Sequence, residues 1–301
     1  MKKTTMAALI IAGVCLFLGA AFAGIGFLLT DDLKPWQPTG FDAAGYDIAE
    51  PFDNVTVHTE DFDVTVLASA DGKCHVEVRD EGSGFGMRPA EHQVSVVDGT
   101  LHIRQTEKPF RFGFFWGERE ITLWLPEQGC DTLSVKTASG DVSVPSGELR
   151  FQNASMTSTS GDLAFAGSVE SHLTVSTTSG DATVNALAQN VNAESTSGDL
   201  EFHCTANYVV AKTTSGDVEL TSVGCNDLHV TTTSGDVEFS DLRALQTNIH
   251  TASGEVKGSL KTTKFFDVKT TSGSVNVPHS EGADGDFKVE TTSGDVSIWL
   301  A

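Results

Sequence analysis

The stretch that decides the fold is residues 213–218, which read Thr-Thr-Ser-Gly-Asp-Val. Close variants of this phrase occur nine times, and consecutive copies are 18 to 21 residues apart. A short and nearly constant period is typical of a solenoid, in which each repeat forms one coil stacked on the last. The nine glycines of the phrase are Gly140, Gly161, Gly180, Gly198, Gly216, Gly235, Gly254, Gly273 and Gly294.

Apolar and polar residues alternate on both sides of each Ser-Gly pair, which predicts a strand, a turn and a second strand with one buried face. Equivalent strands recur once per repeat, so we expect them to stack in parallel at a spacing of about 4.8 Å. The sequence therefore predicts an all-β protein, a parallel β-solenoid with coils of about 19 residues. The residues two positions after the glycine are all aliphatic: Val142, Leu163, Ala182, Leu200, Val218, Val237, Val256, Val275 and Val296.

The residues around the glycine are expected to build the corner between the two strands. Glycine supplies a backbone conformation that residues with a Cβ adopt reluctantly, and the following aspartate can hydrogen-bond the turn backbone. By the parity of the strand, the hydroxyls three and one before the glycine, such as Thr213 and Ser215, are expected to point inward. Stacked inward hydroxyls can bond the turn amides, so they require no functional role.

The amino terminus has the pattern of a membrane anchor. Lys2 and Lys3 precede an uncharged, largely apolar run over 6–29, and Asp31 follows it. This run is long enough to cross a hydrocarbon core of about 30 Å, and the basic residues predict a cytoplasmic amino terminus. We therefore predict a single-pass transmembrane helix within 1–30, with the rest of the chain extracytoplasmic. The alternative is a cleaved signal peptide, because residues 21–23 (Ala-Phe-Ala) resemble a cleavage site.

Residues 31–50, with two prolines and two glycines, are predicted to be a linker above the membrane. The solenoid is expected over 51–301. Its part from 51 to 130 lacks the glycine phrase and is interpreted as irregular opening coils that cap the stack. Residues 131–301 form the regular repeats, and the last repeat in the chain is expected to be the other end of the stack.

The composition limits the partners. The formal net charge is −22, from 41 acidic against 19 basic residues, which argues against binding nucleic acid or anionic lipid head groups. Four cysteines follow the anchor, where disulfides can persist. Cys74 with Cys130, and Cys204 with Cys225, are possible bridges, and the sequence leaves both pairings open. The cysteines have no zinc-type spacing.

The most regular polar feature is a ladder of corner aspartates. Stacked carboxylates repel one another, so hydrogen bonds from turn amides, or a bridging cation, must offset the repulsion. Calcium prefers carboxylate oxygens, but the doubled glycines of calcium nonapeptide repeats are absent. No cofactor is predicted, and calcium is retained as an alternative. The ladder consists of Asp141, Asp162, Asp181, Asp199, Asp217, Asp236 and Asp295, interrupted by Glu255 and Ser274.

The chain is predicted not to be an enzyme. A polysaccharide-cleaving β-helix needs a unique cluster of acids and bases in a groove, whereas the most regular acids here belong to the repeat itself. The histidines are scattered through the sequence.

One aromatic segment breaks the repeat pattern. It is either a contact site for a partner or a membrane, or a cover over the open end of the solenoid. Its residues are Phe110, Phe112, Phe114, Phe115 and Trp116.

Several stretches resemble a known family. They are residues 63–66 (Asp-Val-Thr-Val), residues 98–103 (Asp-Gly-Thr-Leu-His-Ile), and Leu-Pro at 125–126 ahead of Leu-Ser-Val at 133–135, followed by the repeated Ser-Gly-Asp phrase. Together they are similar to the putative-adhesin family of bacterial envelope proteins. The resemblance implies a surface-facing, non-enzymatic β-solenoid, sometimes associated with envelope stress functions. It supplies no catalytic residues.

The expected function is therefore a membrane-anchored, extracytoplasmic binding, adhesin-like or scaffolding module of the bacterial cell envelope. Its partner would be an envelope or surface protein or a glycan. The alternatives are a regulatory ectodomain in envelope stress signalling and a polysaccharide-active β-helix enzyme.

Overall fold

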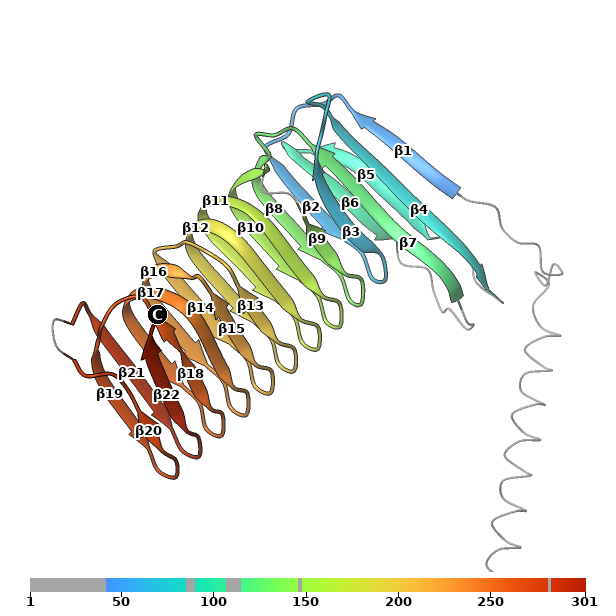
Figure 1. Ribbon diagram of the computed structural model, residues 1–301. Coiled ribbons are helices and arrows are strands. Elements are labelled where there is room, and N and C mark those ends of the chain that lie inside the picture. The colour runs from blue at the N-terminus through green and yellow to red at the C-terminus, as the bar shows by residue number, and fades with distance from the viewer. Residues whose placement is uncertain (1–41, 85–89, 107–114, 146–147, 281–282) are drawn as a thin grey trace, which may run out of the picture.

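The computed structural model describes residues 42–84, 90–106, 115–145, 148–280 and 283–301. A long stack of coils runs through them, and tight turns line one long edge of the stack (Figure 1). The described residues contain strands and no helix. Fold class and coil size are as the sequence predicts, because alternating apolar residues recur at the same two positions of every coil.

One interior coil shows how the sequence builds the others. Strand β14 (Tyr208–Lys212) leads into the Ser-Gly corner, and β15 (Val218–Thr221) leads out of it. Buried and exposed residues alternate along both strands. β14 pairs in parallel with a strand of the coil on each side, with Val209 opposite Val191 and Leu228. Equivalent residues therefore lie above one another, and each coil buries the apolar face of its neighbours.

The strands form two parallel columns, which we call the entry column (before the corner) and the exit column (after it). Strands β11, β12 and β17 run through both. In spatial order the entry column is β6 (Thr100–Thr106), β2 (Asn54–His58), β8 (Cys130–Lys136), β10 (Arg150–Thr157), β11 (Leu163–Ser176), β12 (Ala182–Glu194), β14, β16 (Gly224–Thr231), β17 (Val237–His250), β21 (Asp286–Thr291) and β19 (Phe265–Thr270). The exit column is β7 (Phe115–Leu125), β3 (Asp63–Ala68), β9 (Val142–Val144), β11, β12, β13 (Leu200–Phe202), β15, β17, β18 (Val256–Leu260), β22 (Val296–Leu300) and β20 (Val275–Asn276).

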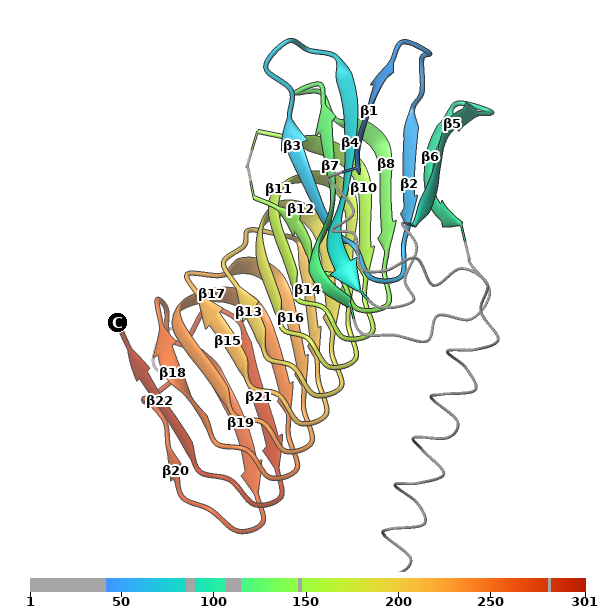
Figure 2. The same ribbon diagram turned by 90° about the vertical axis from the view of Figure 1, so that its right-hand side faces the viewer.

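The last coil of the chain is not the end of the stack, which corrects the prediction from the sequence. β21 pairs with β17 on one side and β19 on the other, and β22 lies between β18 and β20 in the same way. The chain thus makes the outermost coil, β19–β20, before it inserts β21–β22 one position further into the stack. The labels β19 and β20 mark this outermost coil in Figures 1 and 2.

The other end has a matching exchange of order and an antiparallel cap. The first coil in sequence, β2–β3, lies between β6–β7 and β8–β9. Three strands then pair antiparallel: β4 (Cys74–Gly84) with β7, β1 (Asp42–Ile48) with β4, and β5 (Glu91–Val97) with β6. Residues 51–130 are therefore only partly coils, and β1 lies within the range predicted as linker. Antiparallel strands cover the edge that parallel stacking leaves open (Figure 2).

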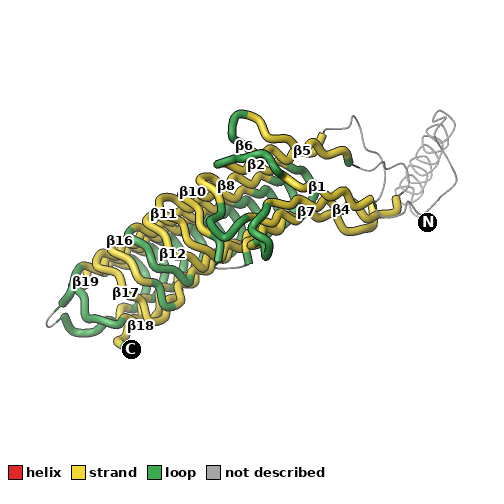
Figure 3. Tube along the Cα trace, turned by 90° about the horizontal axis from the view of Figure 1, so that it is seen from above, coloured by secondary structure: helices red, strands yellow, loops and turns green. Residues whose placement is uncertain are grey.

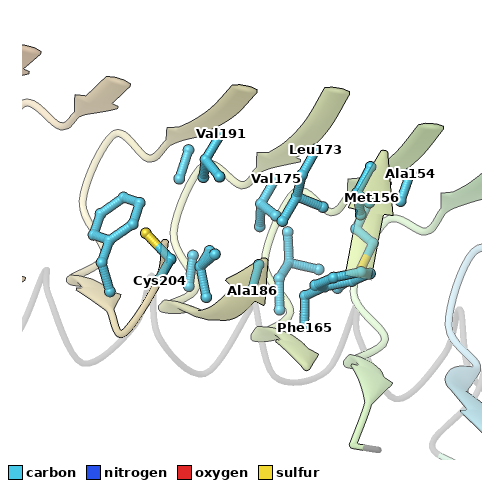
Figure 4. Close-up of a cluster of buried hydrophobic side chains, with 14 of the residues drawn as sticks. Ala154, Met156, Phe165, Leu173, Val175, Ala186, Val191 and Cys204 are labelled. Carbon is cyan, nitrogen blue, oxygen red and sulfur yellow. The ribbon is translucent and has the colours of Figure 1, made fainter. Parts of the chain in front are cut away.

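A continuous apolar core fills the space between the two columns (Figure 4). The aliphatic residue two positions after the glycine is at most 1 % exposed in every regular coil except the outermost, where Val275 is 46 % exposed. Four positions after the glycine the side chain is again apolar, with Gly258 as the exception. A Cβ on Gly258 would meet the ring of Phe239 at 2.5 Å, so that ring fills the space of the missing side chain.

The predicted anchor at 1–30 lies outside the described residues, as do 31–41 of the predicted linker. Within the part of the chain that the structure describes, no helix is long and apolar enough to cross a membrane.

Candidate functional site

The Ser-Gly corner is held by contacts between neighbouring coils. A Cβ placed on Gly216 would lie 1.9 Å from the carbonyl oxygen of Gly198 in the coil before it. The sequence suggested that glycine supplies an unusual backbone conformation at the corner, but the corner glycines do not have positive φ values. Glycine is needed here because the neighbouring coil approaches too closely for a side chain. The hydroxyl of Thr213 accepts the amide of Gly216 (3.1 Å) and donates to the carbonyl of Gly198 (3.3 Å).

The hydroxyl three before the glycine is buried, as predicted, and Thr213 is 3 % exposed. The hydroxyl one before it is not: Ser215 is exposed, because the chain has already turned at that point. The buried hydroxyls therefore hold the corner together and are unavailable to a ligand.

The aspartate ladder is a chain of hydrogen bonds from coil to coil. The Oδ1 atom of each aspartate accepts the main-chain amide of the equivalent residue in the next coil, as when Asp236 donates to Asp217 at 2.8 Å. Sequence reasoning missed the first member, Asp63, which accepts the amide of Asp141 and lacks the glycine phrase. Ser274 lies in the outermost coil. No further described coil lies beyond it, so there is no amide for a carboxylate at this position to accept. The donors to the ladder are Asp141, Asp162, Asp181, Asp199, Asp217, Asp236, Glu255 and Ser274.

These hydrogen bonds account for the aspartates without a cation. Each carboxylate has a backbone donor within 2.7 to 2.9 Å. In the described ranges, no three acidic, histidine or cysteine side chains gather as a metal ion would require.

The predicted aromatic contact residues Phe110, Phe112 and Phe114 lie outside the described residues. Phe115 and Trp116 begin strand β7.

The four cysteines among the described residues, Cys74, Cys130, Cys204 and Cys225, are free thiols. Cys204 points into the core (Figure 4), and burial, followed by the nearby Cys225 sulfur, raises the pKa of its thiol to about 12. Burial likewise raises the pKa of the Cys130 thiol to about 12, and Cys74 lies close enough to contribute. The predicted pairs are thus neighbours, but they remain unbridged.

A groove of about 400 Å³ lies on the edge opposite the corners, the edge that faces the viewer in Figure 3. The Leu187 side chain is 61 % exposed here. Its backbone forms an isolated parallel β-bridge with Thr205, and Thr205 forms another with Gly224 in the next coil. The sequence carried one signal for this site, a leucine seven residues after Gly180 where neighbouring repeats have Ser168 or Thr205. The lining is Pro145, Ala166, Gly167, Ser168, Asn185, Ala186, Leu187, His203, Cys204, Thr205 and Ser222.

A histidine with two carboxylates lies at the antiparallel cap. The Nδ1 atom of His75 is 2.7 Å from Asp47 on β1, and its Nε2 atom is 3.0 Å from Asp71. These two hydrogen bonds, to Asp47 first and then to Asp71, raise the pKa of His75. Because both ring nitrogens face carboxylates, these contacts favour the protonated ring, and neither nitrogen is free to act as a base.

A second charged group is buried beneath the cap. Arg119 is 7 % exposed and contacts Asp61, while its Nε atom is 2.9 Å from Asp80. Its guanidinium lies 5.5 Å from the centre of the Phe62 ring. Charged side chains buried in this way are paired, and this cluster closes the end of the core.

Two consecutive matches to one family model cover residues 52–188 and 184–301. The chain belongs to the Toastrack DUF4097 family. The two matches meet in the middle of the stack, so the Toastrack region accounts for the solenoid and much of its cap. No curated protein matches this chain.

The chain is also similar to solved structures at low sequence identity. One, described as a putative lipid binding protein from Parabacteroides distasonis, is 13 % identical with a TM-score of 0.52, over 87 % of this chain and 98 % of that one. Another, described as a putative adhesin from Bacteroides fragilis, is 15 % identical with a TM-score of 0.47, over 88 % and 100 % of the two chains. At 13 % identity, the match to the lipid binding protein shows a shared fold and nothing more.

Proposed function

We propose that this chain is a non-enzymatic binding module of the bacterial cell envelope, of adhesin-like or scaffolding type. In this proposal residues 1–30 anchor it in the membrane and the solenoid stands on the extracytoplasmic side. The apolar run beside Lys2 and Lys3 supports the anchor and its orientation. Membership of the Toastrack family, with relatives named as adhesins and binding proteins, supports the binding role.

The observation that carries the proposal is the composition of the groove. The described residues that line it include hydroxyls, an amide, the exposed imidazole of His203 and the exposed Leu187, and they include neither aspartate nor glutamate. Hydrolysis of a glycosidic bond canonically uses a pair of carboxylates that flank the bond. The groove therefore suits a ligand that is uncharged where it touches the protein, held by polar contacts and by burial of Leu187.

Leu187→Asp tests the groove, because it places a charge where we expect an uncharged contact. The variant should lose at least about tenfold in affinity for cell-wall sacculi or whole cells in co-sedimentation, the scale expected when one contact of a small interface is lost. Leu245→Asp is the matched control, since Leu245 is 46 % exposed and lies outside the groove. If both variants bind as well as the wild type, the groove is not the binding site.

Fractionation of cells tests the location. The full chain should sediment with membranes, and protease added to spheroplasts should degrade the solenoid. Recovery of an intact chain in the cytoplasmic fraction would contradict the proposal.

A further inference from the structure

The outermost coil, β19–β20, leaves the core of the solenoid open. The inward-facing residues Phe266 and Val268 are only half-buried. Their counterparts one coil further in, Phe287 and Val289, are completely buried. The difference arises because β21 is covered by β19, whereas no described strand covers β19 itself.

Among the described residues, one row of backbone hydrogen-bonding groups on β19 has no partner. The amide of Phe265 donates to the carbonyl of Gly285 at 2.9 Å, so it points toward the stack. Backbone groups alternate in direction along a strand. The amides and carbonyls of Phe266, Val268 and Thr270 therefore point away from β21 toward the free edge, and such an edge is a template for another strand.

We propose that two copies of this chain pair end to end through β19, in antiparallel fashion, about a two-fold axis at Val268. In this arrangement Val268 exchanges both backbone hydrogen bonds with Val268 of the second copy, and Phe266 does the same with Thr270. All three residues have free groups on this edge. The half-buried faces of the two strands then join, and each open core covers the other.

The charges on the outer face of β19 select this register. Asp267 and Lys269 are exposed, with side chains 59 % and 64 % accessible, and their nearest charged atoms lie 3.3 Å apart within one copy. With the axis at Val268, Asp267 of each copy lies opposite Lys269 of the other. Moving the axis by one residue places Asp267 opposite Asp267, or Lys269 opposite Lys269, and like charges directly opposite are unfavourable. The strand is therefore self-complementary in one register.

A further parallel coil fits this end less well than an antiparallel copy. At the interior steps of the aspartate ladder, a carboxylate accepts the amide of the next coil, as Asp236 does for Glu255 at 2.7 Å. The outermost coil has Ser274 at this position, and its hydroxyl bonds back to Asp295. An added parallel coil would find no carboxylate there. The opposite end of the solenoid is already covered by its antiparallel strands.

If residues 1–30 anchor the chain as proposed, end-to-end pairing determines how the rods are arranged in the envelope. The anchored end of the rod is amino-terminal and β19 lies at the far end (Figure 1). Pairing of the far ends would join rods that stand on two facing surfaces. The pairing itself does not depend on the anchor, so the experiments below can fail or succeed independently of cellular location.

Cysteine cross-linking of the full chain in detergent tests the register. One population carries Asp267→Cys and a second, with a different tag, carries Lys269→Cys. Directly opposite residues are close enough for a disulfide, whereas same-residue Cα atoms would be separated by about 8 Å, beyond the limit of roughly 7 Å. We expect mixed oxidation to give at least about tenfold more cross-linked dimer than either population alone. If copies associated through residues 1–30 alone, the yield of cross-linked dimer would be the same in the mixture and in each single population.

Charge reversal provides a second test without cysteines. Asp267→Lys and Lys269→Asp should each raise the dissociation constant of the dimer about tenfold, because each puts like charges opposite one another twice. The double variant, or a mixture of the two singles, should restore pairing. Glu238→Lys is the matched control, since Glu238 pairs with Lys257 at 3.4 Å on an interior coil.

Three results would overturn the proposal: a monomeric wild type in sedimentation at every soluble concentration, cross-linking that is equal within and between populations, or charge variants without effect. Circular dichroism of each variant checks that the solenoid remains folded.

Discussion

At the scale of the residue, the corner glycines show how a repeated phrase produces a repeated contact. Each corner glycine lies against a backbone carbonyl of the neighbouring coil, with no room for a side chain; that carbonyl belongs to the corner glycine of that coil except at Gly140, which meets Phe62. The buried hydroxyl of Thr213 bridges the same two coils. Glycine and threonine therefore recur together because one permits the close approach and the other satisfies the polar groups that it buries.

Gly198→Ala should destabilise the solenoid strongly. The added Cβ would lie 1.7 Å from the carbonyl oxygen of Gly180, and backbone atoms of a continuous stack cannot move away cheaply. We expect a loss of about 3 kcal/mol or more in the free energy of unfolding, measured by urea denaturation. Gly45→Ala is the control, because nothing lies within 4 Å of a Cβ there. Equal stability of the two variants would contradict the close approach.

His75 should titrate above its ordinary pKa of 6.5, because Asp47 and Asp71 stabilise its protonated form. A group whose folded pKa is raised contributes stability that is fully present below the unfolded pKa and is lost as pH rises through the folded pKa. The contacts of His75 with the two aspartates should therefore weaken above pH 6.5. NMR titration of the ring measures the midpoint, and Asp47→Asn should lower it toward 6.5. Glu50→Gln, which removes an acid that does not bond to the ring, should leave it unchanged; a midpoint at or below 6.5 in the wild type would refute these contacts.

At the scale of the element, the aspartates connect neighbouring coils through hydrogen bonds on the exit side of the corners. The sequence predicted that they bond the turn backbone, and the structure shows that the bonded amide belongs to the next coil. Asp63 belongs to the ladder although it has no glycine phrase, because its carboxylate accepts the amide of Asp141 in the next coil. Ser274 can end the ladder because it lies in the outermost coil and only donates, to Asp295.

Asp217→Ala should cost about 1 kcal/mol of stability, because the amide of Asp236 loses its acceptor. Asp217→Asn keeps an oxygen at the same position and should cost less than half as much. Thermal or urea unfolding of the two variants measures the difference. If they are equally destabilised, the negative charge matters and the hydrogen bond does not.

Calcium should leave the melting temperature of the protein unchanged when it is compared with a sample in a chelator. The ladder carboxylates already accept backbone hydrogen bonds, and the described residues offer no cluster of three metal-ligating side chains. Differential scanning calorimetry makes the comparison, with magnesium as the control for ionic strength. A rise of several degrees specific to calcium would show that the ladder binds the metal after all.

At the scale of the whole molecule, both ends of the stack are built out of sequence order. The first and last coils of the solenoid each lie one step inside the coil that is adjacent to them in sequence. The amino-terminal end is covered by antiparallel strands, and the other end is open. The two ends of the rod therefore differ: one is capped by antiparallel strands that include β1, and the other is suited to self-association.

Hydrogen exchange should reveal this order. The amides of β21 and β22 should exchange more slowly than those of β19 and β20, although they lie nearer the carboxyl terminus, because they have partner strands on both sides. Mass spectrometry of peptides over 265–276 and 286–300 gives the comparison, and it should be made with the charge variant Lys269→Asp to separate the effect of pairing between copies. Faster exchange at 286–300 would contradict the inserted coil.

Much of the fold was predictable because the repeat carries its information locally. The alternation around each Ser-Gly pair specified two strands and a corner, and Val218 and its equivalents specified the buried face. The candidate site was less accessible to sequence reasoning. Leu187 is one leucine among many until the coils are stacked, and His75 meets Asp47 and Asp71 only because β1 folds back on β4.

The sequence by itself determined the period, the parallel coils and the buried ladders, because these depend on contacts between equivalent positions of neighbouring repeats. Only the tertiary structure decided the stacking order at the two ends, the antiparallel cap and the open edge of β19. The physical reason is that similar coils present nearly identical edges to one another. Which edge a coil chooses is settled by long-range pairing, and no local pattern of residues encodes that choice.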